Sequence, residues 1–290
     1  MSSTGGLAAA ALVLSLIGCT RTEPVGGDGT TLGPGKGAIA VKGSDTMVIL
    51  AQRWAEEFMK AHPGATVQVT GGGTGTGIAA LINGTTDICQ ASRPMKEKER
   101  ADLAQKRGAE AVETKVALDA IAVYVNEKNP ISEISVPDLA KVYTGKTTSW
   151  SDLGGGADKI VVYGRENSSG TYGYFKEHVL GNADFDQTVQ TLAGTSAVAA
   201  AVKGDPRGIG YGGIAYLEGI KALKVKRDAS APAIAASPQT AQDGTYPLAR
   251  SLLFYTAGPA KGTSKRFIEF VTGAEGQKVI EEVGYYPLPQ

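Results

Sequence analysis

The chain has 290 residues, 42% of them hydrophobic and 20% charged, which is the composition of a soluble globular protein with one large or two ordinary domains. Lysine and arginine together equal aspartate and glutamate in number, and this balance argues against a nucleic-acid binder, which would carry a basic excess. The 39 glycines occur in clusters, which mark sharp turns or places where a ligand comes close to the backbone.

The N-terminal segment has the features of an export signal. Residues 12–18 form an apolar run that is shorter than the roughly 20 residues of a membrane span but has the length of a signal-peptide core. Residues 1–11 lack the lysine or arginine with which export signals normally begin. We expect a signal peptide over residues 1–18.

A lipid anchor is predicted directly after this signal. Leu16-Ile17-Gly18-Cys19 resembles a bacterial lipobox, in which the cysteine is lipidated and becomes the new N-terminus. An ordinary signal peptide with a chance cysteine is the alternative. Residues 20–37 are rich in Gly, Thr and Pro and poor in apolar side chains, so they cannot bury enough surface to fold. We interpret residues 19–37 as a lipid anchor at Cys19 followed by a flexible tether.

From residue 38 onward, short apolar or β-branched segments alternate with segments whose apolar residues recur every three to four positions. In chain order, we expect a strand at 38–42, a helix at 46–60, a strand at 66–70, a short helix through Ile78 and Ile82, a strand at 86–91, a helix at 96–107, a strand at 116–125, a helix at 136–143, a strand at 160–163, a helix through Tyr172 and Phe175, a helix at 195–203, a loop at 226–246, a strand at 248–255 and helices at 261–273 and 274–283. This alternation predicts an α/β fold with mainly parallel sheets flanked by helices.

Three turns share one pattern, in which a strand is followed by Gly, Ser or Thr residues and then by a helix. They are Gly43-Ser44-Asp45-Thr46, Gly73-Thr74-Gly75-Thr76-Gly77 and Ser168-Ser169-Gly170-Thr171. The first N–H groups of a helix lack intrahelical partners and carry partial positive charge, hydroxyls add donors, and glycine admits an anion close to the backbone. Arg165 adds a planar fork of donors that suits a tetrahedral oxyanion. The three turns together therefore predict an anion site, although each alone is also typical of a simple helix cap.

Enzymatic motifs are missing from the sequence. The glycine-rich turn fits neither the dinucleotide pattern G-x-G-x-x-G nor the P-loop ending G-K-[ST], and no G-x-S-x-G elbow occurs. The two histidines, His62 and His178, are far apart and have no metal-ligand spacing. Cys89 lies in an apolar segment and is expected to be a small buried side chain. We therefore expect no catalytic residue, metal or cofactor.

The chain resembles the phosphate-binding proteins of bacterial ABC transporters from about residue 38 to its end. The matching segments are Gly43 to Thr46, Gly71 to Ile78, Asp87 to Pro94, Val142 to Lys146 with Trp150, Gly164 to Thr171, and Gly208 to Tyr211. The resemblance implies a two-lobed periplasmic-binding-protein fold (type II-like) with the ligand in the interlobe cleft. Lobe one would hold residues 38–120 and 248–290, and lobe two would hold residues 121–247.

The resemblance also implies which residues bind phosphate. Lobe one would contribute Ser44, Thr46, Thr74 and Ser92, and lobe two would contribute Arg165, Ser169, Gly170 and Thr171. Asp45, Gly75 and Thr76 join this set because they lie in the predicted anion turns, and Arg93 because it follows Ser92.

The sequence departs from the family at one position. Members of the family often have an aspartate next to Ala91-Ser92, where it accepts the proton of the phosphate, and this chain has Arg93 there. Asp45 is the nearest carboxylate in a predicted anion turn, so we predict that it takes over this role; a simple helix cap is the alternative.

The leading hypothesis is therefore a monomeric receptor that binds inorganic phosphate and delivers it to the permease subunits of an ABC importer. It would act in the periplasm or at the cell surface, where the lipid anchor is its only attachment to the membrane. A receptor for sulfate, molybdate or tungstate is the first alternative. A secreted phosphohydrolase is the second, but it would need a nucleophile with a base or a metal, and the sequence supplies neither.

Overall fold

The computed structural model describes Met1 and residues 37–289. Residues 2–18 of the predicted signal peptide, the predicted lipidation site Cys19 and nearly all of the predicted tether lie outside the described residues. No helix of the described part has both the length and the apolar character needed to cross a bilayer.

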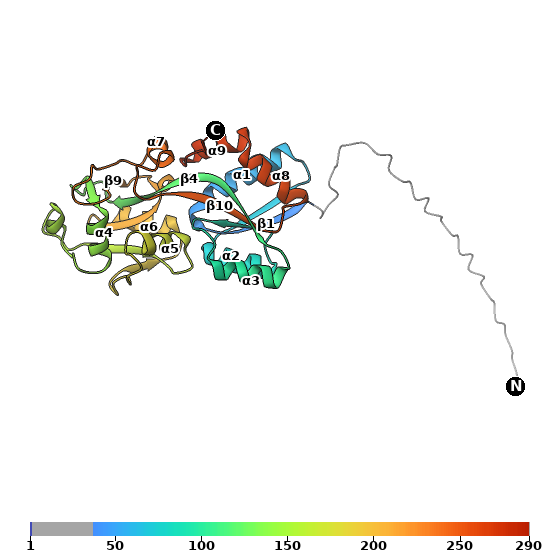
Figure 1. Cartoon of the computed structure of the whole chain (residues 1–290), viewed down its shortest axis with the longest axis horizontal. Coiled ribbons are helices and arrows are strands. Elements are labelled where there is room, and N and C mark those ends of the chain that lie inside the picture. Colours follow the sequence, from blue (N-terminus) through green and yellow to red (C-terminus); the bar gives the residue numbers. More distant parts are fainter. Residues whose placement is uncertain (2–36, 290) are drawn as a thin grey trace. The chain divides into compact units, whose positions relative to one another are not determined.

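The described chain alternates strands and helices, as predicted, and Figure 1 labels the main elements. The strands are β1 (Ala38–Gly43), β2 (Thr66–Thr70), β3 (Ile88–Ala91), β4 (Ala111–Val125), β5 (Glu133–Ser135), β6 (Val161–Arg165), β7 (Gln190–Leu192), β8 (Gly208–Gly213), β9 (Lys221–Lys226) and β10 (Ala249–Ala257). The α-helices are α1 (Val48–Ala61), α2 (Thr74–Asn83), α3 (Glu97–Arg107), α4 (Val136–Tyr143), α5 (Gly170–His178), α6 (Thr195–Gly204), α7 (Pro238–Gln242), α8 (Gly262–Thr272) and α9 (Ala274–Val283). The short 3-10 helices are η1 (Asp45–Met47), η2 (Trp150–Leu153) and η3 (Ile214–Tyr216).

The strands form a mixed sheet in the order β2-β1-β3-β10-β4-β8-β6-β7, with β9 paired to β4 and β5. Pairings among β1, β2 and β3 are parallel, as are those among β6, β7 and β8. Every pairing made by β4 or β10 is antiparallel. The prediction of mainly parallel sheets therefore holds on either side of these two strands, while the sheet as a whole is mixed.

Strand β4 belongs to both halves of this sheet. Between residues 111 and 120 it pairs with β10, and from residue 121 to 125 it pairs with β8. Its last residues also pair with β9. One strand therefore changes partners in its middle, and β10 runs beside it in the opposite direction.

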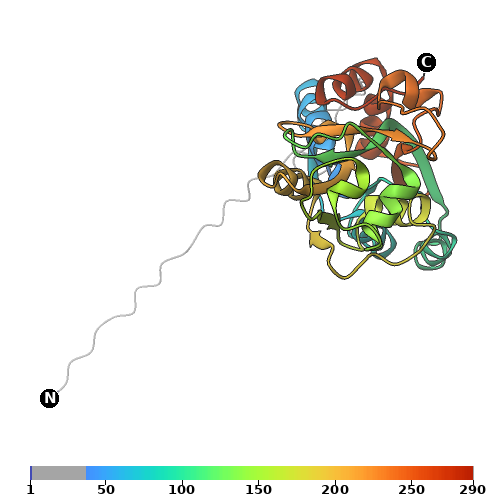
Figure 2. The same cartoon turned by 90° about the vertical axis from the view of Figure 1, so that its left-hand side faces the viewer.

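The sheet is buried on both faces around β3 and β10. Ile88 and Phe254 pack into one apolar cluster, which contains the buried side chains of α1, while Cys89 and Tyr255 pack into a second cluster with those of α2. Figures 1 and 2 show α1 (blue) beside the C-terminal helices α8 and α9 (red), so the beginning and the end of the described chain cover the same face. Alternate residues of a strand point to opposite faces, which explains why a continuous apolar run is needed here.

Helix α1 illustrates how closely the sequence pattern matches the packing. Its predicted apolar face, which includes Leu50, Trp54 and Phe58, is fully buried. Burial of an aromatic side chain of this size contributes about 1.5–3 kcal/mol to the free energy of folding. The indole N–H of Trp54 keeps a partner, because it donates to the Gly276 carbonyl at 2.8 Å.

The expected loop at 226–246 is wrong in part, because it contains α7. Ser237 caps this helix by accepting from the Thr240 N–H, and Pro238 occupies its first position, so the start signal was present in the sequence. Strand β9 was also not predicted. It exposes Lys224 but buries Leu223 and Val225, and this short alternation gives a weaker signal than a continuous apolar run.

Candidate oxyanion-binding site

Four strand-to-helix turns come together in the described part of the chain. Three are the predicted turns at the starts of η1, α2 and α5, and the fourth lies at the start of α6. Thr46 Oγ1 lies 2.8 Å from Thr171 Oγ1 and 3.5 Å from Thr195 Oγ1. The N–H of Gly75 donates to the Ser168 carbonyl at 2.9 Å. These contacts join the four turns into one site.

The site is lined with hydroxyl groups that are shielded from water. Those with an exposed fraction of 2% or less are Ser44, Thr46, Thr74, Ser92, Ser169, Thr171 and Thr195. A buried hydroxyl without a partner costs about 1–3 kcal/mol, so their hydrogen bonds determine what the site can bind.

Most of these hydroxyl oxygens already accept a hydrogen bond from a protein donor. Thr74 accepts from the Ser92 N–H, Ser92 from the Ser44 hydroxyl, Ser169 from the Tyr172 N–H, Thr171 from Arg250 Nη2, and Thr195 from Arg165 Nη1. A hydroxyl carries a single proton, so each of these five groups keeps that proton for donation, either to a neighbouring hydroxyl of the cluster or to a bound anion. The site therefore presents O–H donors, which an anion requires.

The turns approach each other so closely that glycine is required where they meet. A Cβ atom on Gly170 would lie 2.3 Å from Thr74 Oγ1 and 2.6 Å from Ser92 Oγ. A Cβ atom on Gly73 would lie 2.6 Å from the Ser168 carbonyl oxygen, and this residue also has a φ of +91°. Both distances are far below van der Waals contact, so the close approach depends on the missing side chains.

Arg165 lies between charged and neutral partners at the edge of the hydroxyl cluster. Its side chain is 1% exposed, and Nη2 contacts Asp45 Oδ2 at 2.7 Å and Glu166 Oε1 at 2.9 Å. Nη1 donates to Thr195 Oγ1 at 2.8 Å. Asp45 also accepts the Gly72 N–H through Oδ1 at 2.7 Å. Asp45 therefore links the first two anion turns to the arginine of the third.

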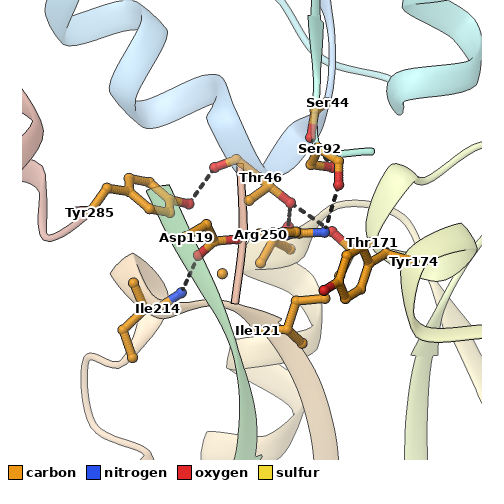
Figure 3. A network of polar contacts seen from close by, with 12 residues as sticks. Ser44, Thr46, Ser92, Asp119, Ile121, Thr171, Tyr174, Ile214, Arg250 and Tyr285 are labelled. Atoms are coloured by element: carbon orange, nitrogen blue, oxygen red, sulfur yellow. Dashed lines mark hydrogen bonds and ion pairs between the residues drawn. The ribbon is translucent and has the colours of Figure 1, made fainter. Parts of the chain in front are cut away.

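A second ion pair, between Asp119 and Arg250, borders the hydroxyl cluster (Figure 3). Asp119 is fully buried and Arg250 is 7% exposed. Burial raises the pKa of the Asp119 carboxyl, and the Arg250 guanidinium beside it opposes that rise. Two tyrosine hydroxyls hold the backbone of η1 nearby, because Tyr285 donates to the Thr46 carbonyl at 2.6 Å and Tyr216 to the Asp45 carbonyl at 2.8 Å.

The structure brings together most of the predicted site residues but turns two of them elsewhere. Thr76 Oγ1 donates to the Gly72 carbonyl at 2.5 Å within its own turn. Arg93 makes a two-pronged pair with Glu99 at 2.7 and 2.9 Å. Burial opposes ionisation of Glu99, but the hydrogen bonds from Arg93 and the Lys96 N–H outweigh it and lower the Glu99 pKa. Neither Thr76 nor Arg93 contacts the hydroxyl cluster through these bonds.

Sequence reasoning missed three residues of the site, although a signal existed for each. Thr195 follows Gly194 at a helix start, as Thr74 follows Gly73, and both glycines have a positive φ and a ψ of 152°. Asp119 and Arg250 are single charges within apolar strands. A charge in such a strand is rarely buried without a partner, so the two could have been matched to each other.

The described residues contain no group of three or more His, Cys, Asp and Glu side chains placed to hold a metal ion. Cys89 is buried, as predicted, and burial raises the pKa of its thiol, so the nucleophilic thiolate is disfavoured.

Two sheet halves joined by β4 and β10, with a buried cluster of donors at the strand-to-helix turns, define the class of two-lobed periplasmic binding proteins. A family model described as a PBP superfamily domain matches residues 28–275. The phosphate-binding protein PstS of Pseudomonas aeruginosa PAO1 is 33% identical over 270 residues, which cover 87% of this chain and 84% of that protein. Protein SphX of Synechococcus elongatus is 34% identical over 264 residues, which cover 87% and 77%.

Solved structures agree with these relatives. A putative phosphate ABC transporter substrate-binding protein from Clostridium perfringens, with bound phosphate, has a TM-score of 0.78 and 26% identity, and the match covers 87% of this chain and all of that one. An ABC-type phosphate transport receptor from Vibrio cholerae has a TM-score of 0.69 and 28% identity, with the same coverage. The chain therefore belongs to the PBP superfamily and, within it, to the family of PstS phosphate-binding proteins.

Proposed function

We propose that this chain binds inorganic phosphate in the hydroxyl-lined site and delivers it to an ABC importer. The observation that carries the proposal is the set of buried hydroxyls, each with a proton to donate, next to the buried guanidinium of Arg165. Such a site offers many donors to a small oxyanion at once. The names of the relatives from Pseudomonas, Clostridium and Vibrio support phosphate as the ligand and ABC transport as the context.

The proposed ligands come from both lobes. Ser44, Thr46, Thr74 and Ser92 bind from lobe one, and Arg165, Ser169, Gly170 and Thr171 bind from lobe two, where Thr195 joins them. Gly75 and Asp45 complete the set. Thr76 and Arg93 would have to leave Gly72 and Glu99 before they could join it.

We assign residues 38–120 and 248–290 to lobe one and residues 121–247 to lobe two. The change of β4 partners at residues 120 and 121 supports this boundary, because the strand there passes from β10 to β8. The direct contacts between Thr46 and Thr171 and between Asp45 and Arg165 would then cross the cleft and belong to a closed state. Phosphate would favour this state because its ligands are complete only there.

A calorimetric panel of phosphate, sulfate, molybdate and tungstate tests the proposed ligand. Phosphate should bind most tightly, and a stronger response to another anion would favour the alternative receptor. A chromogenic phosphate ester tests the hydrolase alternative in parallel. We expect no turnover, because the proposed site contains donors but no activated nucleophile.

Discrimination between phosphate and sulfate is assigned to Asp45. A carboxylate accepts hydrogen bonds only, so it favours phosphate, which keeps a proton at neutral pH, over sulfate, which has none. Asp45→Asn is expected to lower the affinity for phosphate and to raise the affinity for sulfate relative to the wild-type protein, since it removes a negative charge beside Arg165. Calorimetry with both anions measures the change. Sulfate that stays excluded from this variant would show that Asp45 serves only to hold Gly72 and Arg165.

We further propose that residues 1–18 are removed as a signal peptide and that Cys19 anchors the protein, as a monomer, to the membrane in the periplasm or at the cell surface. Two acyl chains anchor a protein firmly, whereas one is only marginal. The intact mass of the native protein is expected to correspond to a diacylated chain that begins at Cys19. Cys19→Ala is the control and should remain in the aqueous phase after detergent extraction. An unmodified mature chain with another N-terminus would contradict the anchor.

A further inference from the structure

Asp119 and Arg250 lie directly opposite each other on β4 and β10, the two strands that join the sheet halves. Arg250 Nε and Nη2 donate to Asp119 Oδ2 at 2.9 and 2.7 Å. Asp119 Oδ1 accepts the Ile214 N–H at 3.1 Å. Replacement of a buried ion pair by apolar side chains is often neutral or stabilising, so stability alone does not explain its presence.

The remaining donors of Arg250 reach the predicted ligand turns (Figure 3). Nη1 donates to the Ser92 carbonyl at 3.0 Å, and Nη2 donates to Thr171 Oγ1 at 3.1 Å. The Tyr174 ring lies 5.7 Å from the guanidinium carbon, and its hydroxyl donates to the Ala249 carbonyl at 2.8 Å. The guanidinium is thus held by Asp119 on one edge and by Tyr174 on one face, while its other edge faces Ser92 and Thr171.

This contact restricts the directions in which the Thr171 hydroxyl can donate its proton. An arginine can only donate hydrogen bonds, so Thr171 Oγ1 must accept from it. The proton of Thr171 is then directed either to Thr46 Oγ1, 2.8 Å away, or to a bound anion. Arg250 occupies one of the two acceptor positions of Thr171 Oγ1 and so keeps the Thr171 proton pointing away from the guanidinium. Without Arg250, this constraint on the proton would be lost.

We propose that Arg250, held by Asp119, is a positioning residue of the oxyanion site, which fixes Thr171 as a hydrogen-bond donor and keeps its turn beside Ser92. The proposal rests on the proposed function, phosphate binding in this site. Asp119 and Arg250 would then act on the site without contacting the ligand themselves.

The test is a double-mutant cycle of Arg250→Lys and Thr171→Val, with inorganic phosphate as the probe and calorimetry as the measurement. Lysine keeps the positive charge beside Asp119 but lacks the planar fork, and valine keeps the shape of threonine but lacks its hydroxyl. Arg250→Lys alone is expected to raise the dissociation constant for phosphate about tenfold. In the Thr171→Val background most of that loss should disappear, because the hydroxyl that Arg250 orients is already absent.

The proposal is supported if Arg250→Lys raises the dissociation constant for phosphate at least about three times more in the wild-type background than in the Thr171→Val background. A smaller difference overturns it, because a merely structural role predicts independent losses of affinity. If Arg250→Lys does not fold, the pair Asp119→Asn with Arg250→Met replaces it in the same cycle, since it leaves no unpaired charge and keeps an acceptor for the Ile214 N–H. Wild-type protein that binds no phosphate would overturn the proposed function and this inference with it. Wild-type binding with independent losses would overturn this inference alone.

Discussion

Arg165→Ala is expected to raise the dissociation constant for phosphate at least about a hundredfold, because it removes charge-assisted hydrogen bonds of about 1.5–3 kcal/mol each. The substitution also leaves Asp45 and Glu166 without their shared cation, and both carboxylates would then repel the anion. Their side chains are 17% and 26% exposed, so water can hydrate them and the chain should remain folded.

Calorimetry measures the affinity of this variant, and denaturant unfolding checks its stability. Arg53→Ala is the matched control, because it removes the same charge from an exposed pair with Glu56 on α1. It should bind phosphate like the wild-type protein. An Arg165→Ala variant with unchanged affinity would remove Arg165 from the site.

Gly170→Ala is expected to abolish closure of the two proposed lobes and to raise the dissociation constant for phosphate by a similar factor of about a hundred. The added Cβ would lie 2.3 Å from Thr74 Oγ1 and 2.6 Å from Ser92 Oγ, so these turns, which we assign to different lobes, could no longer meet. Gly170 has no positive φ and is the first residue of α5, where alanine fits well. The variant should therefore lose affinity without losing stability, since only the closed state contains the clash.

Small-angle scattering follows this closure directly. Wild-type protein, freed of ligand beforehand, should show a smaller radius of gyration with saturating phosphate, whereas Gly170→Ala should not change. Gly204→Ala is the control, because Gly204 ends α6 with an ordinary φ and no atom within 4 Å of an added Cβ. Closure by Gly170→Ala to the wild-type value would contradict this role of Gly170.

The sequence by itself determined most of the elements and the local chemistry of the predicted anion turns. Helix α4 has the predicted bounds, and α2 contains both Ile78 and Ile82, as expected. Such features depend on neighbouring residues: apolar side chains at helical spacing, caps, and glycines that turn the chain. The same is true of the turns that carry Ser44, Thr74 and Ser169, since a helix start attracts an anion wherever it lies.

Only the tertiary structure decided which of these groups face each other. Asp119 and Arg250 are 131 residues apart, and the antiparallel register of β4 and β10 makes them neighbours. Arg93 pairs with Glu99 instead of entering the site. Thr195, which was not predicted as a site residue, accepts a hydrogen bond from Arg165. The physical reason is that a charged or hydroxyl side chain can satisfy its hydrogen bonds with many partners of equal chemistry. The partner it takes is the one that packing and strand register bring within about 3 Å.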